Sequence, residues 1–473
     1  MSNTEISNSS MPFLTFFEEI SKIPRGSGNT KNIADYLESF AKERSLDYIR
    51  DEADNVIIKK SATEGYEGRP CVIIQGHTDM VIQKDPGVTR DVESEGVKLV
   101  YDGDFIRADG TTLGADDGIA VAYALAILDS KEIPHPDIEA VFTSDEEIGL
   151  LGATALDTSN LRGRVMINID SDDEGVFTVG CAGGRRVDIT LPVNKEAIRG
   201  EKYSLIIDGL KGGHSGIEID KGRTNAIKRL AEYLVPIPDV KLISFEGGVA
   251  DNAIPAFAVA EFSSSLGLGA ISDIIDKVHL SISEKTESEN ITLAKAGVAE
   301  ATLTQEDTKN LLSLLSELPS GVIAMSSDIE GQVETSINLG ILKFLESEAE
   351  ISFSLRSAIG EKKEKLAEEL IKTAKKHGAK TSECGDYPAW EYKKDSHLRD
   401  VMCKTYREMY GKDANVITIH AGLECGIFSD KTDGLDCVSA GPDAFDIHTP
   451  KERLSISSAV RFWEFLTEVL KNI

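Results

Sequence analysis

The segment GIAVAYALAILDSKEIPHPDIEAVFTS (residues 118–144) decides the fold class. Its first eleven residues are apolar nearly all round, a pattern that predicts a buried helix. The run IEAVFTS at its end predicts a buried strand, and similar short apolar runs occur nearby as NVIIKK (55–60), CVIIQG (71–76) and VMINID (165–170). Strands that alternate with helices indicate an α/β fold with a doubly wound, mostly parallel sheet.

The domain organisation follows from length and from a change of pattern along the chain. The 473 residues exceed one ordinary hydrophobic core, which predicts two domains. From about residue 187 to 386, helical stretches such as NAIKRLAEYL (225–234) alternate with strand-like runs, and afterwards the first pattern returns with a helix over 456–471. We therefore predict one domain from residues 1–186 and 387–473, interrupted by an inserted α+β domain of residues 187–386.

Charge and hydropathy exclude several classes of partner. Lys and Arg total 51 against 80 Asp and Glu, so the formal net charge is −29 and the long-range field repels nucleic acids and anionic membranes. No segment reaches the ~18–20 consecutive apolar residues of a membrane span. The first residues, MSNTEISNSSMPFLTFFEEI, lack the basic flank of a signal peptide, and the six cysteines show no C-x-x-C spacing. We expect a cytoplasmic protein without a disulfide framework or a thiolate zinc site.

Polar side chains gather where the predicted strands end. His77 and Asp79 follow the strand at 71–76, the run Asp145–Glu147 follows the strand ending at 144, and Asp170 ends the run at 165–170. Ligands of doubly wound sheets bind beyond the carboxyl ends of the strands. This agreement between the acidic clusters and the expected binding edge points to a functional site.

Each of these segments also has an ordinary structural interpretation. Asp116 and Asp117 precede a helix and could serve as its N-cap and first-turn acid. Asp170 could lie in a solvated turn, and His448 before Thr-Pro is uninformative by itself. Together, however, two histidines and several carboxylates form the donor set of zinc, cobalt or manganese. Five ligands with one shared would suit two divalent ions about 3.5–4 Å apart, whose charge would offset the crowding of Asp145–Glu147.

These residues also carry a resemblance to a known family. The segments are QGHTDMV (75–81), DGTTLGADDGIAVAYALAIL (109–128), TSDEEIGLLGA (143–153), GLKGGHSGIEIDKGRTNA (209–226), IHAGLECGIF (419–428) and PDAFDIHTPKERL (442–454). They resemble the M20 family of metallopeptidases, and within it the aminoacyl-histidine dipeptidase branch, over nearly the whole chain. The resemblance implies a zinc-exopeptidase type of catalytic domain with an inserted lid and dimerisation domain.

The resemblance implies a division of labour among the metal ligands. His77 and Asp170 would bind one ion, Glu147 and His448 would bind the other, and Asp116 would bridge them. The peptide bond after this bridging aspartate is cis in the family. The cofactors would be two divalent ions per subunit, zinc first and cobalt or manganese as alternatives.

The same resemblance assigns the catalytic carboxylates. Asp79, two residues after His77, would orient His77 and raise its basicity. Glu146 would act as general base and acid on the water that the ions activate. Neighbours on an extended backbone point in different directions, which would let Glu147 face an ion while Glu146 faces the water. The pattern leaves Asp145 unassigned.

The inserted domain would complete the substrate site. His214 matches a histidine that polarises the scissile carbonyl, usually across a dimer interface, and Arg356 suits a bidentate grip on a C-terminal carboxylate. Asn252 and Gly422 match further substrate contacts. His214 could instead be a turn residue, and Asn252 and Arg356 could be structural. His420 and Glu424 have no assigned role, and a homodimer through the inserted domain is implied.

The sequence therefore predicts an enzyme that hydrolyses small peptides. The leading hypothesis is a metallo-dipeptidase that accepts Xaa-His and other dipeptides. An N-acyl-amino-acid deacylase or a tripeptide aminopeptidase would need the same water and base, and only residues lining the pocket would discriminate. A non-catalytic scaffold relative would be expected to lack Glu146, His214 or a metal ligand, whereas all are present.

Overall fold

The computed structural model describes residues 11–282 and 288–473, and the chain divides into two compact units. Unit 1 comprises Met1–Gly180, Tyr392–Thr418 and Leu423–Ile473, and unit 2 comprises Cys181–Glu391 and Ile419–Gly422. The predicted domain boundaries, 1–186 with 387–473 and 187–386, and the roles predicted for these two domains stay predictions. Among the helices of the described residues, none combines the length and the apolar character needed to cross a membrane.

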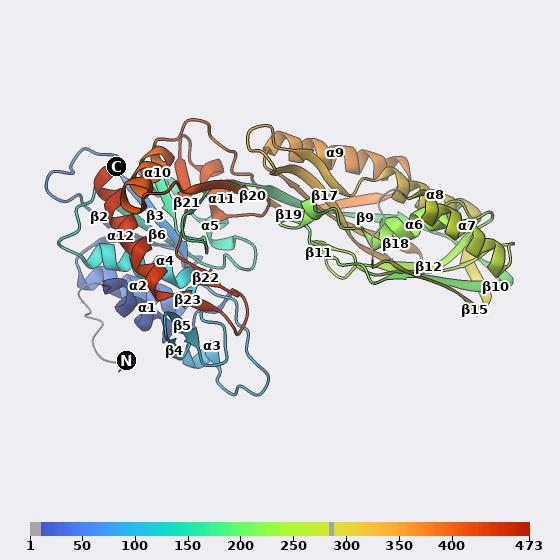
Figure 1. The fold of residues 1–473 in the computed structure, drawn as a ribbon, viewed down its shortest axis with the longest axis horizontal. Helices are drawn as coiled ribbons and strands as arrows, with labels where there is room; N and C mark the ends of the chain where they lie inside the picture. The colour runs from blue at the N-terminus through green and yellow to red at the C-terminus, as the bar shows by residue number, and fades with distance from the viewer. Residues whose placement is uncertain (1–10, 283–287) are drawn as a thin grey trace. The chain divides into compact units, whose positions relative to one another are not determined.

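An eight-stranded mixed sheet forms the centre of unit 1 (Figure 1). Its strands lie in the order β1 (Asp47–Arg50), β2 (Val56–Lys60), β6 (Ile138–Thr143), β3 (Val72–His77), β7 (Val165–Asn168), β21 (Asp436–Ser439), β8 (Val176–Cys181) and β20 (Asn415–Ile419). The four central strands β6, β3, β7 and β21 are parallel, whereas β1 pairs antiparallel with β2, β2 with β6 and β8 with β21. The predicted α/β class is confirmed.

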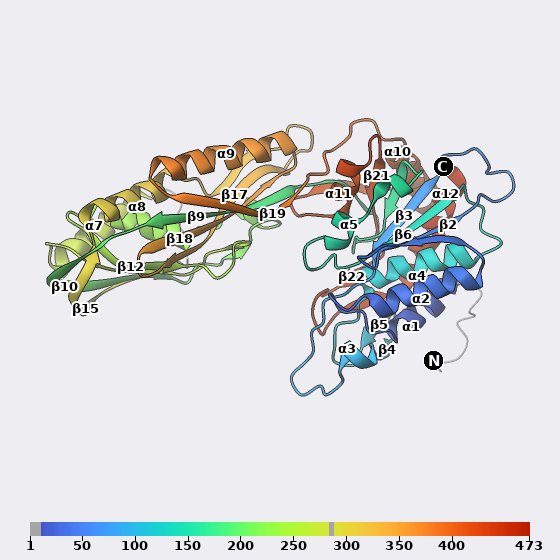
Figure 2. The same ribbon diagram turned by 180° about the vertical axis from the view of Figure 1, so that it is seen from behind.

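Helices cover both faces of this sheet. On one face lie α1 (Pro12–Ser21), α2 (Lys31–Glu43), α4 (Ala115–Asp129), α10 (His397–Tyr410) and α12 (Ile456–Asn472), and Figure 2 shows α1, α2 and α4 together there. The ring of Tyr123 in α4 lies 4.8 Å from Phe13 and 5.9 Å from Trp463 between ring centroids. The opposite face carries α5 (Leu151–Ala155) and α11 (Glu424–Lys431), so strand residues pointing either way are buried.

Smaller elements complete unit 1. A four-stranded antiparallel sheet has the order β22 (Ala444–Phe445), β23 (Arg453–Ser455), β5 (Phe105–Ala108) and β4 (Leu99–Asp102). The short helix α3 (Val92–Glu95) precedes β4, and a 3-10 turn covers Thr158–Asn160. This small sheet joins the segment around residue 105 to the segment around residue 450, which contains His448.

Unit 2 is built on a nine-stranded antiparallel sheet. The strand order is β15 (Asn290–Leu303), β10 (Lys195–Asp208), β14 (Ala258–Ser263), β12 (Lys241–Gly247), β17 (Val333–Phe344), β18 (Glu348–Ser357), β9 (Gly183–Pro192) and β19 (Lys380–Tyr387), with β16 (Gly321–Met325) paired to β17. A separate pair joins β11 (Gly213–His214) to β13 (Ala253–Ile254), and a 3-10 turn covers Ile219–Lys221.

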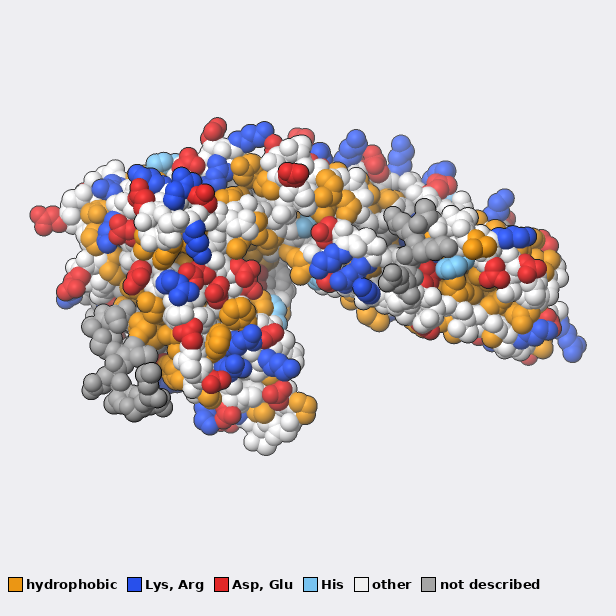
Figure 3. Space-filling view, in the orientation of Figure 1, with side chains coloured by type: hydrophobic (Ala, Val, Ile, Leu, Met, Phe, Trp, Pro, Cys, Tyr) orange, Lys and Arg blue, Asp and Glu red, His pale blue; other side chains and the backbone are white. Residues whose placement is uncertain are grey.

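Four helices pack on one face of the unit 2 sheet: α6 (Ala226–Leu234), α7 (Leu268–Ser281), α8 (Gln305–Glu317) and α9 (Gly360–Lys376). Helix α9 is amphipathic, because Leu366, Ala367, Leu370 and Ala374 are buried while lysines and glutamates occupy most of the exposed positions. Figure 3 shows these charged side chains along the outer side of the helix. Unit 2 therefore has a hydrophobic core of its own.

Candidate metal centre

Three neighbouring parallel strands deliver the central side chains of the site. Strand β3 ends with His77, the chain after β7 reaches Asp170, and the chain after β6 reaches Glu146 and Glu147. Because β6, β3 and β7 are adjacent and parallel, their carboxyl ends meet at one edge of the sheet. The expected gathering of polar residues at the strand ends is found there.

Asp116 and His448 join this edge from other parts of the chain. The Nε2 atom of His77 lies 2.9 Å from Oδ1 of Asp116, and Nε2 of His448 lies 3.1 Å from Oδ2 of the same carboxylate. His448 also contacts Glu147, at 2.9 Å between Nε2 and Oε1. The peptide bond between Asp116 and Asp117 is cis, as the family resemblance implied. Asp116 thus lies between the two histidines.

The donor atoms form overlapping groups of the size that a metal ion needs. Ligand atoms lie within 4.8 Å of one another in each of three groups: His77 with Asp116 and Asp170, Asp116 with Glu147 and His448, and His77 with Glu146 and Glu147. Among the described residues, no lysine or arginine forms an ion pair with Asp116, Glu147 or Asp170. Imidazole and carboxylate donors without a lysine or arginine partner fit a divalent cation of the zinc, cobalt or manganese type.

Burial and neighbouring charges shift the pKa values of these groups. Burial raises the pKa of Asp170 well above its usual range, and the nearby charge of Asp116 adds to that rise. Hydrogen bonds to Asp116 and Glu147 raise the pKa of His448 to about 10. Burial would lower the pKa of His77, but hydrogen bonds to Asp116 and Asp79 outweigh it and raise this pKa well above normal. A metal ion would therefore have to compete with protons for these side chains.

Asp79 holds both His77 and the loop that carries the two glutamates. The Nδ1 atom of His77 lies 3.1 Å from the backbone oxygen of Asp79 and 3.4 Å from its Oδ1. The Asp79 carboxylate also accepts the backbone N–H groups of Glu146 and Glu147, at 2.9 and 3.3 Å, and the hydroxyl of Ser27 at 2.8 Å. Asp79 therefore orients His77 and also the loop that carries Glu146 and Glu147.

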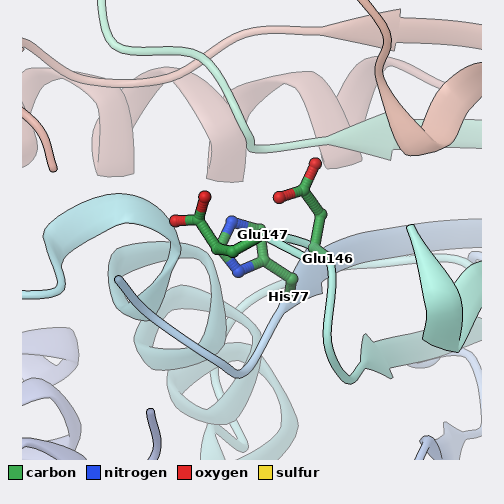
Figure 4. Close-up of side chains that lie close together, drawn as sticks. All are labelled: His77, Glu146 and Glu147. Carbon is green, nitrogen blue, oxygen red and sulfur yellow. The ribbon is translucent and has the colours of Figure 1, made fainter. Parts of the chain in front are cut away.

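The backbone at Glu146 and Glu147 is a turn, so the expectation of extended backbone is wrong. Asp145 has a φ of 50°, and the carbonyl of Glu146 accepts the N–H groups of Gly149 and Leu150 at 3.0 and 2.8 Å. The side chains of Glu146 and Glu147 still leave the loop in different directions (Figure 4). Asp145, unassigned from the sequence, accepts the N–H of Gly28 at 2.6 Å and fixes this turn to the Gly26–Gly28 loop.

Comparison with known proteins matches residues 73–472 to peptidase family M20/M25/M40, a stretch that contains all the residues of the three donor groups. The chain is an M20 family peptidase. It is 36% identical over 475 residues to the cytosol non-specific dipeptidase of Escherichia coli strain K12, covering 98% of each chain. The crystal structure of aminoacylhistidine dipeptidase from Vibrio alginolyticus is similar with a TM-score of 0.94 and 34% identity, covering 100% of this chain and 98% of that chain. Aminopeptidase PepT from Bacillus cereus ATCC 10987 shares the fold, with a TM-score of 0.58, 18% identity and 98% of each chain covered.

Two buried charged residues of this M20 peptidase, Glu452 and Arg25, have structural roles that the sequence did not predict. The carboxylate of Glu452 accepts four backbone N–H groups, those of Leu113, Gly114, Ala115 and Asp116, at 2.7, 2.9, 2.8 and 3.4 Å. The guanidinium of Arg25 donates to the backbone oxygens of Thr78, at 2.9 Å, of Asp79, at 3.3 Å, and of Gly114. These two side chains fix the loops that carry the ligands. Their only sequence signal is their position inside IPRGSGN and HTPKERL.

His214 lies in unit 2 of the M20 peptidase with a defined tautomer. Its Nδ1 atom accepts the N–H groups of Gly216 and Ile217, at 3.1 and 3.3 Å. Because an accepting Nδ1 carries no proton, the neutral ring carries its proton on Nε2. Burial, followed by the charge of Arg356, lowers the pKa of His214. The backbone next to it pairs with the loop of Asn252, since Ser215 N–H donates to the Asn252 oxygen at 2.8 Å.

Arg356 and Gly422 meet around one tyrosine of unit 2. Arg356 is 9% exposed and donates from Nη1 to the hydroxyl of Tyr387 at 2.8 Å, while its Nε has no hydrogen-bond partner among the described residues. Gly422 packs on the same ring, because a Cβ there would lie 2.7 Å from Cε2 of Tyr387. His420 contacts Ser336 Oγ through Nε2 at 2.7 Å, and burial, with Arg356, lowers its pKa to about 4. His420 is thus a neutral buried residue of this cluster.

Proposed function

We propose that this chain is a metal-dependent dipeptidase that hydrolyses Xaa-His and other dipeptides. The observation that carries the proposal is the convergence of His77, Asp116, Glu147, Asp170 and His448 beside a further carboxylate, the half-buried Glu146. The identity of 36% to a cytosol non-specific dipeptidase over 98% of both chains supports the same activity and a cytoplasmic location.

We assign the ligands to two divalent ions. His77 and Asp170 would hold one ion, Glu147 and His448 the other, and Asp116 would be shared, an assignment supported by the two donor groups that have Asp116 in common. Zinc suits these donors best, and cobalt or manganese would also fit. Such ions, when bound, lower the pKa of a water molecule and polarise the substrate carbonyl.

Glu146 would act as general base and then as general acid. Burial, with the neighbouring carboxylates Glu424, Glu147 and Asp116, raises the pKa of Glu146 to about 8 in the chain alone. The added positive charge of bound cations would favour its ionised form, which can take the proton of the attacking water. The protonated carboxyl would then donate that proton to the leaving amine. Asp79 supports this role because it fixes the Glu146 backbone.

Residues of unit 2 would bind the dipeptide, with unit 2 acting as the lid. The Nε2–H of His214 is a neutral donor suited to the oxyanion that forms on the scissile carbonyl. Arg356 would bind the terminal carboxylate, for which its partly unpaired guanidinium is chemically suited. Asn252 and Gly422 would make further contacts to the substrate.

We also propose that two copies associate through unit 2 and that His214 serves the partner subunit's site. Sedimentation should then detect a dimer, and the His214→Ala and Glu146→Gln variants should each be inactive alone. Mixed after reversible dissociation, these two variants should regain part of the activity, because one site of the mixed dimer keeps both residues. Absence of any recovery in dimers shown to have exchanged subunits would refute the shared site.

A substrate panel tests the activity itself. Metal-free protein, reloaded with Zn²⁺, Co²⁺ or Mn²⁺, should cleave dipeptides, including those with carboxyl-terminal histidine, and should be inactive with chelator. Tripeptides and N-acetyl amino acids serve as the comparison substrates. If acetylated amino acids are cleaved and dipeptides are not, the chain is a deacylase; preference for tripeptides would make it a tripeptide aminopeptidase.

Matched variants of the adjacent glutamates test the division of labour. Glu146→Gln should keep both metals and lose about 10²–10⁴-fold in kcat, because only proton transfer is removed. Glu147→Gln should lose one equivalent of metal, measured by elemental analysis after dialysis. The assignment is wrong if the two variants show the same metal content and the same loss of activity.

A further inference from the structure

Glu424 is a fully buried carboxylate at the start of α11 that the proposed reaction does not use. Its side chain is 0% exposed. The Oε2 atom accepts hydrogen bonds from Nε2 of Gln75 at 2.5 Å and from Oγ1 of Thr143 at 2.7 Å. The Oε1 of Gln75 in turn accepts from Nδ2 of Asn168 at 2.6 Å. A continuous network of side-chain hydrogen bonds therefore connects β6, β3 and β7.

This chain of polar groups lies directly beneath the metal ligands. Gln75 precedes His77 by two residues, and side chains two apart on a strand share a face. Asn168 precedes Asp170 by the same interval. The Oδ1 atom of Asn168 accepts a hydrogen bond from the backbone N–H of Asp170 at 3.3 Å. Thr143 ends the strand that leads to the glutamate turn. Each of the three strands that carry ligands is thus linked to Glu424.

The charge of Glu424 has no ordinary partner. No lysine or arginine forms an ion pair with it among the residues that the structure describes, and its Oε1 atom has no hydrogen bond there. Burial raises the pKa of Glu424 to about 7 against the opposing charge of His77, and proximity to Glu424 in turn raises the pKa of Glu146. A buried, unpaired carboxylate costs stability unless a cation lies nearby.

We propose that Glu424 is a positioning residue of the metal centre: it joins the three strand ends that present His77, Glu147 and Asp170 and supplies negative charge behind them. This inference rests on the proposed function, because the cations that offset the charge are those of the dipeptidase site. Glu424 stabilises the metal-loaded protein at the expense of the metal-free one. Among the described residues, Glu424 belongs to none of the three donor groups, so we do not count it as a metal ligand.

The variant Glu424→Gln removes the charge of this side chain and nearly keeps its shape. The amide keeps one oxygen that can accept from Gln75 and Thr143, and it removes the buried charge. Zn²⁺ affinity, measured by competition with a chelator, should fall about tenfold. The thermal midpoint of the metal-free protein should stay the same or rise, because the unpaired charge is gone.

Glu139→Gln provides a matched control, because Glu139 lies at the start of β6 and Thr143, which binds Glu424, lies at its end. Glu139 is also buried, but its carboxylate accepts from Lys59 Nζ at 3.0 Å and from the N–H groups of Arg162 and Gly163, both at 2.9 Å. This control should lower the midpoint of the metal-free protein and leave Zn²⁺ affinity unchanged. The two variants should thus differ in both the Zn²⁺ affinity and the midpoint, which distinguishes a positioning role from a purely structural one.

Every outcome decides the inference. If Glu424→Gln behaves like Glu139→Gln, or binds Zn²⁺ as tightly as the wild type, the inference is wrong while the proposed function stands. If the wild-type protein binds no Zn²⁺, Co²⁺ or Mn²⁺, the proposed function fails and this inference with it. Should Glu424→Gln not fold, Thr143→Val removes one hydrogen bond to Glu424 and keeps the charge; it must weaken Zn²⁺ binding, and unchanged binding refutes the inference.

Discussion

Replacing Glu452 by glutamine should destabilise unit 1 by an amount that follows from four hydrogen bonds. Oε2 of Glu452 accepts the N–H groups of Leu113 and Gly114, and Oε1 accepts those of Ala115 and Asp116. Glutamine has one oxygen and one NH₂ group, so two of these buried donors lose their acceptor. A buried donor left unpaired costs about 1–3 kcal/mol, which gives about 2–6 kcal/mol for the pair.

Scanning calorimetry of the metal-free protein measures this effect directly. For a unit of this size, 1 kcal/mol corresponds to about 2–4 °C, so the midpoint of the unit 1 transition should fall by at least about 4 °C. Glu464→Gln, the same substitution at an exposed position of α12, should change the free energy of unfolding by no more than about 0.5 kcal/mol. A midpoint of Glu452→Gln less than about 4 °C below that of the control would refute the view that this carboxylate holds the start of α4.

Three further predictions concern the pH dependence and the substrate contacts. The pKa of His448, about 10, lies above its ordinary value of 6.5, so its ion pairs stabilise the metal-free protein fully below pH 6.5 and are lost as the pH rises through about 10. Zn²⁺ must displace that proton; its affinity should therefore rise with pH, and calorimetry in buffers of different ionisation enthalpy should detect proton release. Arg356→Leu should raise KM about 100-fold with a smaller change in kcat, and an unchanged KM would remove Arg356 from the carboxylate site. His214→Ala should lower kcat by about 100-fold or more while the metal content, by elemental analysis, stays that of the wild type.

Local patterns in the sequence were sufficient to predict most of unit 1. The apolar run at 118–128 became the buried part of α4, and the runs at 55–60, 71–76, 138–144 and 165–170 correspond to β2, β3, β6 and β7. Periodicity predicts such elements because burial on both faces requires continuous apolar strands. Positive φ at a non-glycine residue has no comparable signal, and for that reason the turn begun by Asp145 was predicted as extended backbone.

The sequence by itself determined the α/β class, the placing of His77, Asp170 and the acidic run at strand ends, and the family. The family resemblance already predicted that Asp116 and His448, 332 residues apart, would meet, and their side chains lie 3.1 Å apart. Only the tertiary structure decided that Glu424 reaches Gln75 across 349 residues. Such contacts depend on how packed elements bring chain segments together, and no local spacing encodes them. The physical reason is that hydrogen bonds and buried charges act over a few ångströms in space, whatever their separation along the chain.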